Sequence, residues 1–91
     1  MDARERFTQW LIEKGYPEFT PAGNRSTARD YPFRVEQVCE NENLSWDALA
    51  AQIDSVIPAY DRGGVKEAKG NQSNRSVINA LKRYREFVKE Q

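Results

Sequence analysis

The sequence predicts an all-α fold, a small bundle of four main helices at about residues 3–14, 26–42, 46–60 and 74–90. In each segment apolar residues recur every three or four positions, which is the spacing of one helix face. No segment shows the apolar–polar alternation of a half-buried strand. A chain of 91 residues buries one modest core, so we expect residues 1–91 to form a single domain.

The first predicted helix carries Phe7, Trp10 and Leu11 on its apolar face and stops at Gly15. Because Trp10 lies on that face, we expect it in the core rather than exposed for stacking on bases. Residues 15–24 combine glycine, proline and asparagine, which break helices and form turns, so they predict a loop.

The second predicted helix has Ser26 or Thr27 as its cap. Pro32 lies inside this segment, and a proline removes one backbone hydrogen bond from a helix. Either the helix kinks at Pro32, or it begins near Asp30 with the proline in its first turn. Its buried face is expected to comprise Tyr31, Val35, Val38 and Cys39.

The third predicted helix has the clearest pattern. Ser45 is the expected cap, since it directly precedes the apolar run. Asp47 and Asp54 lie on the opposite face without a basic neighbour on the helix, and we expect them to form solvated surface. The apolar face consists of Trp46, Leu49, Ala50, Ile53, Val56, Ile57 and Tyr60.

Residues 61–74 contain three glycines and little to bury, so they predict a mobile loop. Ser73 or Asn74 is the expected cap of the last helix. On that helix Arg85 points toward the apolar face, where its charged end must reach water or a carboxylate. The buried face is expected to comprise Val77, Ile78, Leu81, Tyr84 and Val88.

The net charge is zero, from 14 basic and 14 acidic residues, but the charges are unevenly distributed. Residues 36–61 hold six acids and no base, whereas residues 62–91 hold eight bases and three acids. Local potential steers a polyanion more than the net charge does, so a basic face is compatible with a neutral chain. In the last helix Arg75, Lys82 and Lys89 fall along one flank.

Composition excludes several kinds of site. The sequence has no His, which removes Ser-His-Asp and Cys-His catalysis and the commonest transition-metal ligand. The lone Cys39 cannot form an internal disulfide, which favours a reducing, cytoplasmic location. We expect no catalytic residue, no metal, no cofactor and no enzymatic activity. The absence of a long apolar run also predicts no membrane span.

Several runs in the sequence resemble a known family. The chain has Phe-Thr-Gln-Trp-Leu at 7–11, Lys-Gly-Tyr at 14–16 and Ser-Thr-Ala-Arg-Asp-Tyr at 26–31. Residues 73–87 read Ser-Asn-Arg-Ser-Val-Ile-Asn-Ala-Leu-Lys-Arg-Tyr-Arg-Glu-Phe. These runs are similar to the first, second and last helices of the core-binding, SAM-like N-terminal domain of tyrosine recombinases and phage integrases.

The resemblance implies a four-helix domain that clasps one side of a DNA duplex, while a separate domain cleaves the strand. The catalytic arginines, lysine, His-containing motif and tyrosine nucleophile of that second domain have no counterpart here, so Tyr84 is not assigned as a nucleophile. The chain departs from the family pattern by an insertion at 21–25 and by the acidic stretch at 36–61.

We therefore predict a non-catalytic module that binds double-stranded DNA by neutralising its phosphates. Asn79 and Arg75 are placed to reach base edges. The predicted DNA-binding residues are Arg25, Arg29, Lys66, Lys69, Arg75, Asn79, Lys82 and Arg83. The alternative is a small protein-interaction module, a phage or mobile-element accessory or inhibitor protein that docks on a larger protein. For that alternative Phe33 either sits exposed as a docking side chain or covers a second part of the core.

Overall fold

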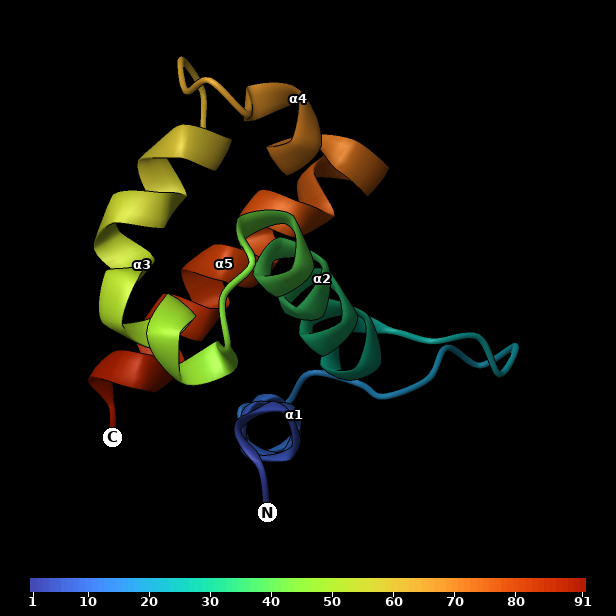
Figure 1. The fold of residues 1–91 in the computed structure, drawn as a ribbon. Coiled ribbons are helices and arrows are strands. Elements are labelled where there is room, and N and C mark those ends of the chain that lie inside the picture. The colour runs from blue at the N-terminus through green and yellow to red at the C-terminus, as the bar shows by residue number, and fades with distance from the viewer.

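A computed structural model describes all 91 residues and confirms the all-α prediction. The four long helices match the predicted segments to within two residues at each end. A fifth, short helix interrupts the segment that was expected to be a mobile loop. In chain order the helices are α1 (Ala3–Glu13), α2 (Thr27–Glu42), α3 (Trp46–Tyr60), α4 (Glu67–Gly70) and α5 (Gln72–Lys89) (Figure 1).

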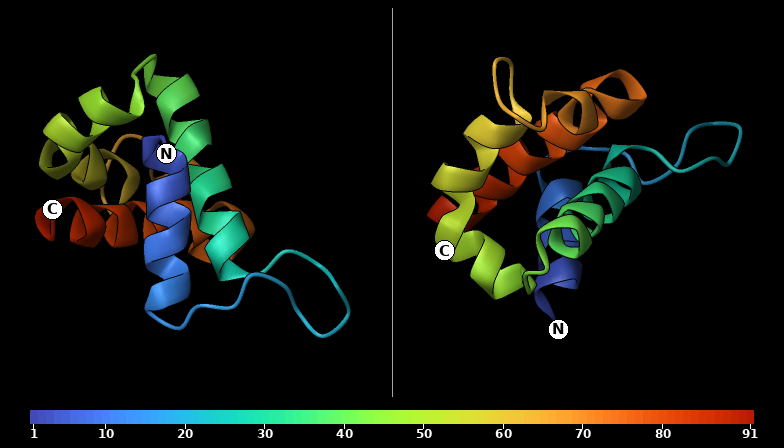
Figure 2. Two further views of the ribbon diagram at one scale, coloured as in Figure 1. Left: turned by 90° about the horizontal axis from the view of Figure 1, so that it is seen from below. Right: turned by 45° about the horizontal axis from the view of Figure 1, so that its top comes forward.

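Helix α5 is the centre of the arrangement and contacts each of the other four helices. Helices α2 and α3 pack against it. Helix α1 packs mainly against α2 and lies at the lower end of the bundle in the view of Figure 1. The segment between α1 and α2 extends away from the bundle in both views of Figure 2. Helix α3 and the projecting segment therefore lie at opposite ends of the molecule in these views, with α2 between them.

The core is built around an aromatic cluster. Phe7 is completely buried, and its ring centroid lies 5.3 Å from that of Tyr84 and 5.6 Å from that of Phe87. Trp10 and Trp46 complete the cluster at centroid distances of 6.1 and 6.2 Å from Phe7. Both tryptophans thus pack against the core, as their positions on apolar helix faces predicted.

Helix caps follow the sequence signals in part. Ser45 caps α3, because its side-chain oxygen accepts a hydrogen bond of 3.0 Å from the backbone N–H of Ala48. Ser26 occupies the N-cap position of α2 but makes no side-chain cap bond. Helix α2 ends at Asn43, whose φ of 55° is left-handed, a conformation that asparagine tolerates better than most residues.

The structure decides between the two alternatives for Pro32. Helix α2 begins at Thr27 and continues through Pro32, so it does not begin near Asp30. Pro32 is buried, and its ring fills part of the interior. The helix gives up one backbone hydrogen bond at this position without ending, because packing of its apolar face stabilises the turns on both sides.

The prediction that Ser73 or Asn74 caps the last helix is wrong. Ser73, Asn74 and Arg75 have φ values of 53°, 58° and 65°, which form a left-handed turn before the right-handed helix continues from Ser76. Such a turn costs about 1–2 kcal/mol per residue for residues other than glycine. The turn redirects the chain, and Arg75 donates from its backbone N–H to the carbonyl of Asn71 at 3.0 Å.

The prediction of a mobile loop at residues 61–74 is also corrected, since this segment packs tightly on the end of α3. Lys66 donates its backbone N–H to the carbonyl oxygen of Ala59 at 2.8 Å. Gly70 is buried, and a Cβ atom added there would lie 1.8 Å from the carbonyl oxygen of Tyr60. Only glycine allows so close an approach of the two backbones. The sequence pattern missed this contact because it joins residues of two different elements.

Candidate nucleic-acid interface

A shallow groove between the C-terminal end of α3 and residues 75–85 of α5 is lined by four cations and one carboxylate. The groove has an excess of positive charge, although the chain as a whole is neutral. Its apolar floor comes from α3. The lining residues are Ile57, Pro58, Asp61, Arg62, Arg75, Lys82 and Arg85.

Asp61 is the single carboxylate of this groove. One of its oxygens, Oδ1, accepts hydrogen bonds from the backbone N–H of Arg62 at 2.8 Å and from the guanidinium of Arg75 at 3.3 Å. The ammonium of Lys82 lies 3.2 Å from Oδ2. The hydrogen bond from the Arg62 N–H, and then those from the two side chains, lower the pKa of Asp61. Asp61 is therefore ionised at neutral pH.

The other two cations of the groove have no carboxylate partner. Arg62 is exposed and Arg85 is half-buried, and neither forms an ion pair. Because these two side chains are not neutralised by a carboxylate, they are the ones free to meet a ligand anion. Neither is among the DNA-binding residues that the sequence predicts.

Lys89 continues the basic flank of α5 toward its C-terminal end. Its ammonium lies 3.1 Å from a carboxylate oxygen of Asp54 on α3, and both side chains are more than half exposed. Asp54 is exposed to solvent, as the sequence predicts, but α5 supplies the basic neighbour that its own helix lacks. An ion pair as exposed as this one is worth little, so it does not remove Lys89 from a binding surface.

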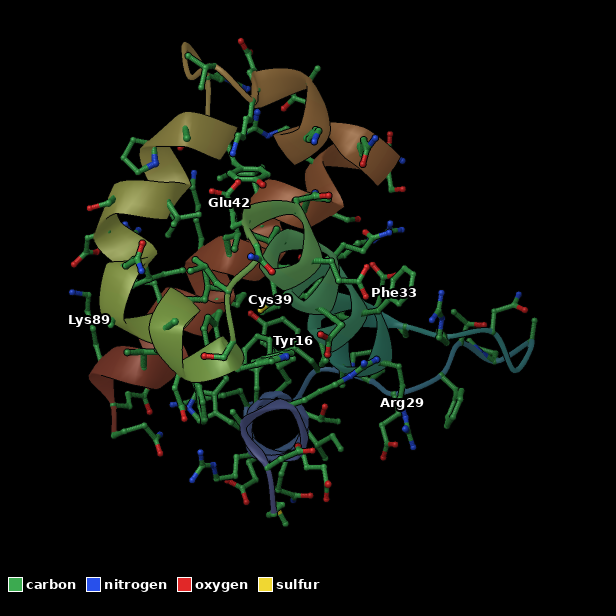
Figure 3. The ribbon with its side chains drawn as sticks, viewed as in Figure 1. Tyr16, Arg29, Phe33, Cys39, Glu42 and Lys89 are labelled. Carbon is green, nitrogen blue, oxygen red and sulfur yellow. The ribbon has the colours of Figure 1, made fainter.

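Two of the predicted DNA-binding residues, Arg25 and Arg29, lie on the other side of the molecule. Figure 3 shows Arg29 and Phe33 beside the projecting segment, opposite to Lys89. Arg29 pairs with Glu18 at 3.2 Å, and the guanidinium of Arg25 lies 4.6 Å from the ring centroid of Phe33. Phe33 is thus half-exposed outside the main core, with an arginine over its ring.

Lys66 and Lys69 are also separated from the groove. Lys66 forms an ion pair with Glu42 of α2, which in turn accepts a hydrogen bond of 2.8 Å from the hydroxyl of Tyr60. Figure 3 places Glu42 at the end of α2, near α4. Lys69 lines a second small depression, whose walls include the acidic side chain of Glu40.

Of the predicted residues on α5, Arg75 and Lys82 line the groove, whereas Asn79 and Arg83 do not. Successive residues on a helix point about 100° apart, so Arg83 turns away from Lys82 toward α2. It pairs there with Glu86 of its own helix, and its pKa is raised mainly by that pair. Asn79 is half-buried and does not line the groove.

Of the two groove residues that the sequence did not predict, Arg62 and Arg85, only Arg85 has a recognisable pattern in the sequence. Arg85 follows Lys82 by three residues, a spacing that places both side chains on neighbouring positions of a helix surface. Arg62 has no such pattern, because it lies beyond the end of α3 and reaches the groove only through the folded connection to α4.

The nucleophilic side chains of the core are protonated at neutral pH. Burial raises the pKa of the Cys39 thiol to about 11 and that of the Tyr84 hydroxyl to about 12. The Tyr84 hydroxyl is occupied as a donor to the carbonyl oxygen of Trp46 at 2.9 Å. Both side chains therefore have structural contacts and lie away from the groove.

Stability is expected to fall in acid partly through Glu42. Its pKa lies below the ordinary value of 4.5, first because Lys66 donates to the carboxylate and then because Tyr60 does. A carboxylate with a depressed pKa stabilises the folded state above its unfolded pKa and loses that contribution as the pH falls through the folded value. The free energy of unfolding of the wild type should therefore drop more steeply than that of Glu42→Gln between about pH 5 and about pH 3.

Urea denaturation at a series of pH values measures this difference. Glu40→Gln is the control, because it removes an exposed carboxylate from the same helix. Parallel profiles for the wild type and Glu42→Gln would contradict the assignment of this pH dependence to the Glu42 contacts.

No helix of the structure is both long and apolar enough to cross a membrane. Comparison of the chain with models of protein families, with curated proteins and with solved structures finds no match. Function is therefore inferred from the groove between α3 and α5 and from the charges that it gathers.

Proposed function

We propose that the protein is a non-catalytic module that binds double-stranded DNA through the groove between α3 and α5. The observation that carries the proposal is that Arg62, Arg75, Lys82 and Arg85 line one groove that holds a single carboxylate. This arrangement gives the groove an excess of positive charge in a concave surface, where field lines are focused. A polyanion gains binding energy there by releasing its condensed counterions.

The spacing of cations along α5 suits the backbone of a nucleic acid strand. Lys82 and Lys89 are seven residues apart, which corresponds to about 10.5 Å along a helix axis. Since the phosphates of one strand follow one another within this range, two flexible lysine side chains at this separation can each reach a different phosphate of the same strand. Contacts of this kind position a protein without reading bases, and the proposed binding is therefore independent of sequence.

The resemblance to the core-binding domain of tyrosine recombinases and phage integrases supports the same class of ligand. Under this proposal the chain corresponds to that DNA-clasping domain. The proposed DNA surface, however, uses only Arg75 and Lys82 of the residues first predicted. Arg25 and Arg29 lie beside the projecting segment and do not line the groove (Figure 3).

Fluorescence polarisation with a labelled duplex of mixed sequence tests the proposal. We expect binding at about 50 mM salt with a slope of log K against log salt near −3, because about three phosphates are neutralised by the excess charge. Two duplexes of unrelated sequence should bind equally. Absence of binding at low salt, or equal competition by polyglutamate at the same concentration of charge, would refute a DNA-binding role.

One observation favours a second candidate function, docking on another protein. The segment between α1 and α2 forms a hairpin closed by a bridge between Phe19 and Arg25, and it exposes 52% of Phe19. An exposed aromatic side chain on a projecting hairpin is a feature of protein-interaction sites. Capture from a nuclease-treated lysate separates the two functions, because a partner bridged by DNA is lost and a docked protein is retained.

A further inference from the structure

The carboxylate of Asp61 pairs with two of the four cations that line the groove. It lies between Arg75 and Lys82, within 3.3 Å of a nitrogen of each. No other carboxylate lines the groove. These two cations are consequently partly neutralised in the free protein, whereas Arg62 and Arg85 are not.

Asp61 is also held firmly in place. It follows Tyr60, which is completely buried, and its backbone N–H donates to the carbonyl oxygen of Ile57 at 3.0 Å. Its own carbonyl oxygen accepts a hydrogen bond of 3.0 Å from the N–H of Gly64. With Oδ1 bound to the N–H of Arg62 as well, the side chain has little freedom to leave the groove.

Arg75 is held from the opposite direction. Its guanidinium donates to the side-chain oxygen of Asn71 at 2.9 Å as well as to Asp61. The left-handed turn at residues 73–75 costs conformational energy, and it is this turn that brings Arg75 toward α3. The pairing of Arg75 with Asp61 is therefore built into the backbone and is not a chance contact of two long side chains.

From this geometry we propose that Asp61 is an internal counter-ion that limits the affinity of the groove for DNA. The inference rests on the proposed function, because it concerns the same groove. A phosphate that enters the groove meets one like charge and two cations that already have a partner. The carboxylate must therefore weaken phosphate binding in the free protein while it keeps the two cations in place.

Two effects of Asp61 oppose each other, and one substitution separates them. The charge of Asp61 repels phosphate, whereas its hydrogen bonds position Arg75 and Lys82. Asp61→Asn removes the charge and keeps an oxygen acceptor of the same size, but Asp61→Ala removes both. If the charge dominates, Asp61→Asn binds DNA more tightly than the wild type, and Asp61→Ala gains less than Asp61→Asn.

The experiment compares the wild type, Asp61→Asn, Asp61→Ala and Glu18→Gln by polarisation with one labelled duplex over a range of salt. Glu18→Gln is the matched control, because it frees Arg29 on the opposite side with the same change in net charge. We expect Asp61→Asn to bind about tenfold more tightly at about 50 mM salt and about threefold more tightly at about 200 mM, which is the effect of one added phosphate contact. Its salt slope should steepen by about 0.9, and Glu18→Gln should match the wild type.

Each outcome decides a different point. Tighter binding by Asp61→Asn, without a gain in Glu18→Gln, supports the inference. This holds even if the wild type binds too weakly for its affinity to be measured. Equal or weaker binding by Asp61→Asn, with a wild type that binds, overturns the inference and leaves the proposed function standing. An equal gain in Asp61→Asn and Glu18→Gln overturns the inference too, since net charge alone then explains it. If no variant binds the duplex, both proposals fail. Thermal melts of each variant show that it is folded.

Discussion

The double variant Arg62→Glu/Arg85→Glu is expected to bind duplex DNA at least about a hundredfold more weakly than the wild type at about 50 mM salt. Each arginine accounts for one phosphate contact, and loss of one contact costs about tenfold under these conditions. The introduced carboxylates then repel the phosphates that the arginines attracted. Because neither arginine forms an ion pair, the substitutions break no native salt bridge. The loss in affinity is therefore separable from a loss in stability.

The matched control is Arg25→Glu/Arg29→Glu, which changes the net charge by the same amount on the opposite side of the molecule (Figure 3). These two residues belong to the DNA-binding set predicted from sequence, so the pair of variants compares that prediction with the groove. We expect the control to bind within about twofold of the wild type, since neither residue lines the groove and salt screens charges outside it. Retention of binding by the groove variant, with loss in the control, would move the DNA site to the projecting hairpin.

Phe7→Ala is expected to lower the free energy of unfolding by about 3–5 kcal/mol, the usual cost of deleting a buried aromatic ring. Phe7 is completely buried, and its ring contacts those of Trp10, Trp46, Tyr84 and Phe87. Those neighbours come from α1 itself, α3 and α5, and they cannot close over the cavity without moving their helices. The loss is a large share of the about 5–14 kcal/mol expected for a domain of this length.

Denaturant unfolding followed by tryptophan fluorescence measures this loss, because Trp10 and Trp46 lie beside the deleted ring. Phe19→Ala is the control, since Phe19 is 52% exposed and its removal should cost no more than about 1 kcal/mol. If Phe7→Ala proves too unstable to purify, Phe7→Leu should give an intermediate loss. A stability of Phe7→Ala within about 1 kcal/mol of the wild type would contradict the central place of this ring in the core.

Helix spacing in the sequence predicts some of the residues that line the groove but not all of them. Arg75 and Lys82 were placed on a common flank from their spacing, and both line the groove. Arg83 was assigned to the same surface, but one residue of helix rotation turns it toward α2 and Glu86. Arg62 was missed because its position depends on how the chain leaves α3 and packs α4 against it.

Periodicity of apolar residues was enough to locate the four long helices, because a helix face is set by residues three or four positions apart. Ser45 was recognisable as a cap for the same reason, since its partner, the N–H of Ala48, is only three residues away. The left-handed turn at residues 73–75 and the approach of Gly70 to Tyr60 had no such local sign. Which charges neutralise one another was decided only when α5 packed beside α3, because Asp61 at the end of α3 meets Arg75 and Lys82 of a different helix, 14 and 21 residues away.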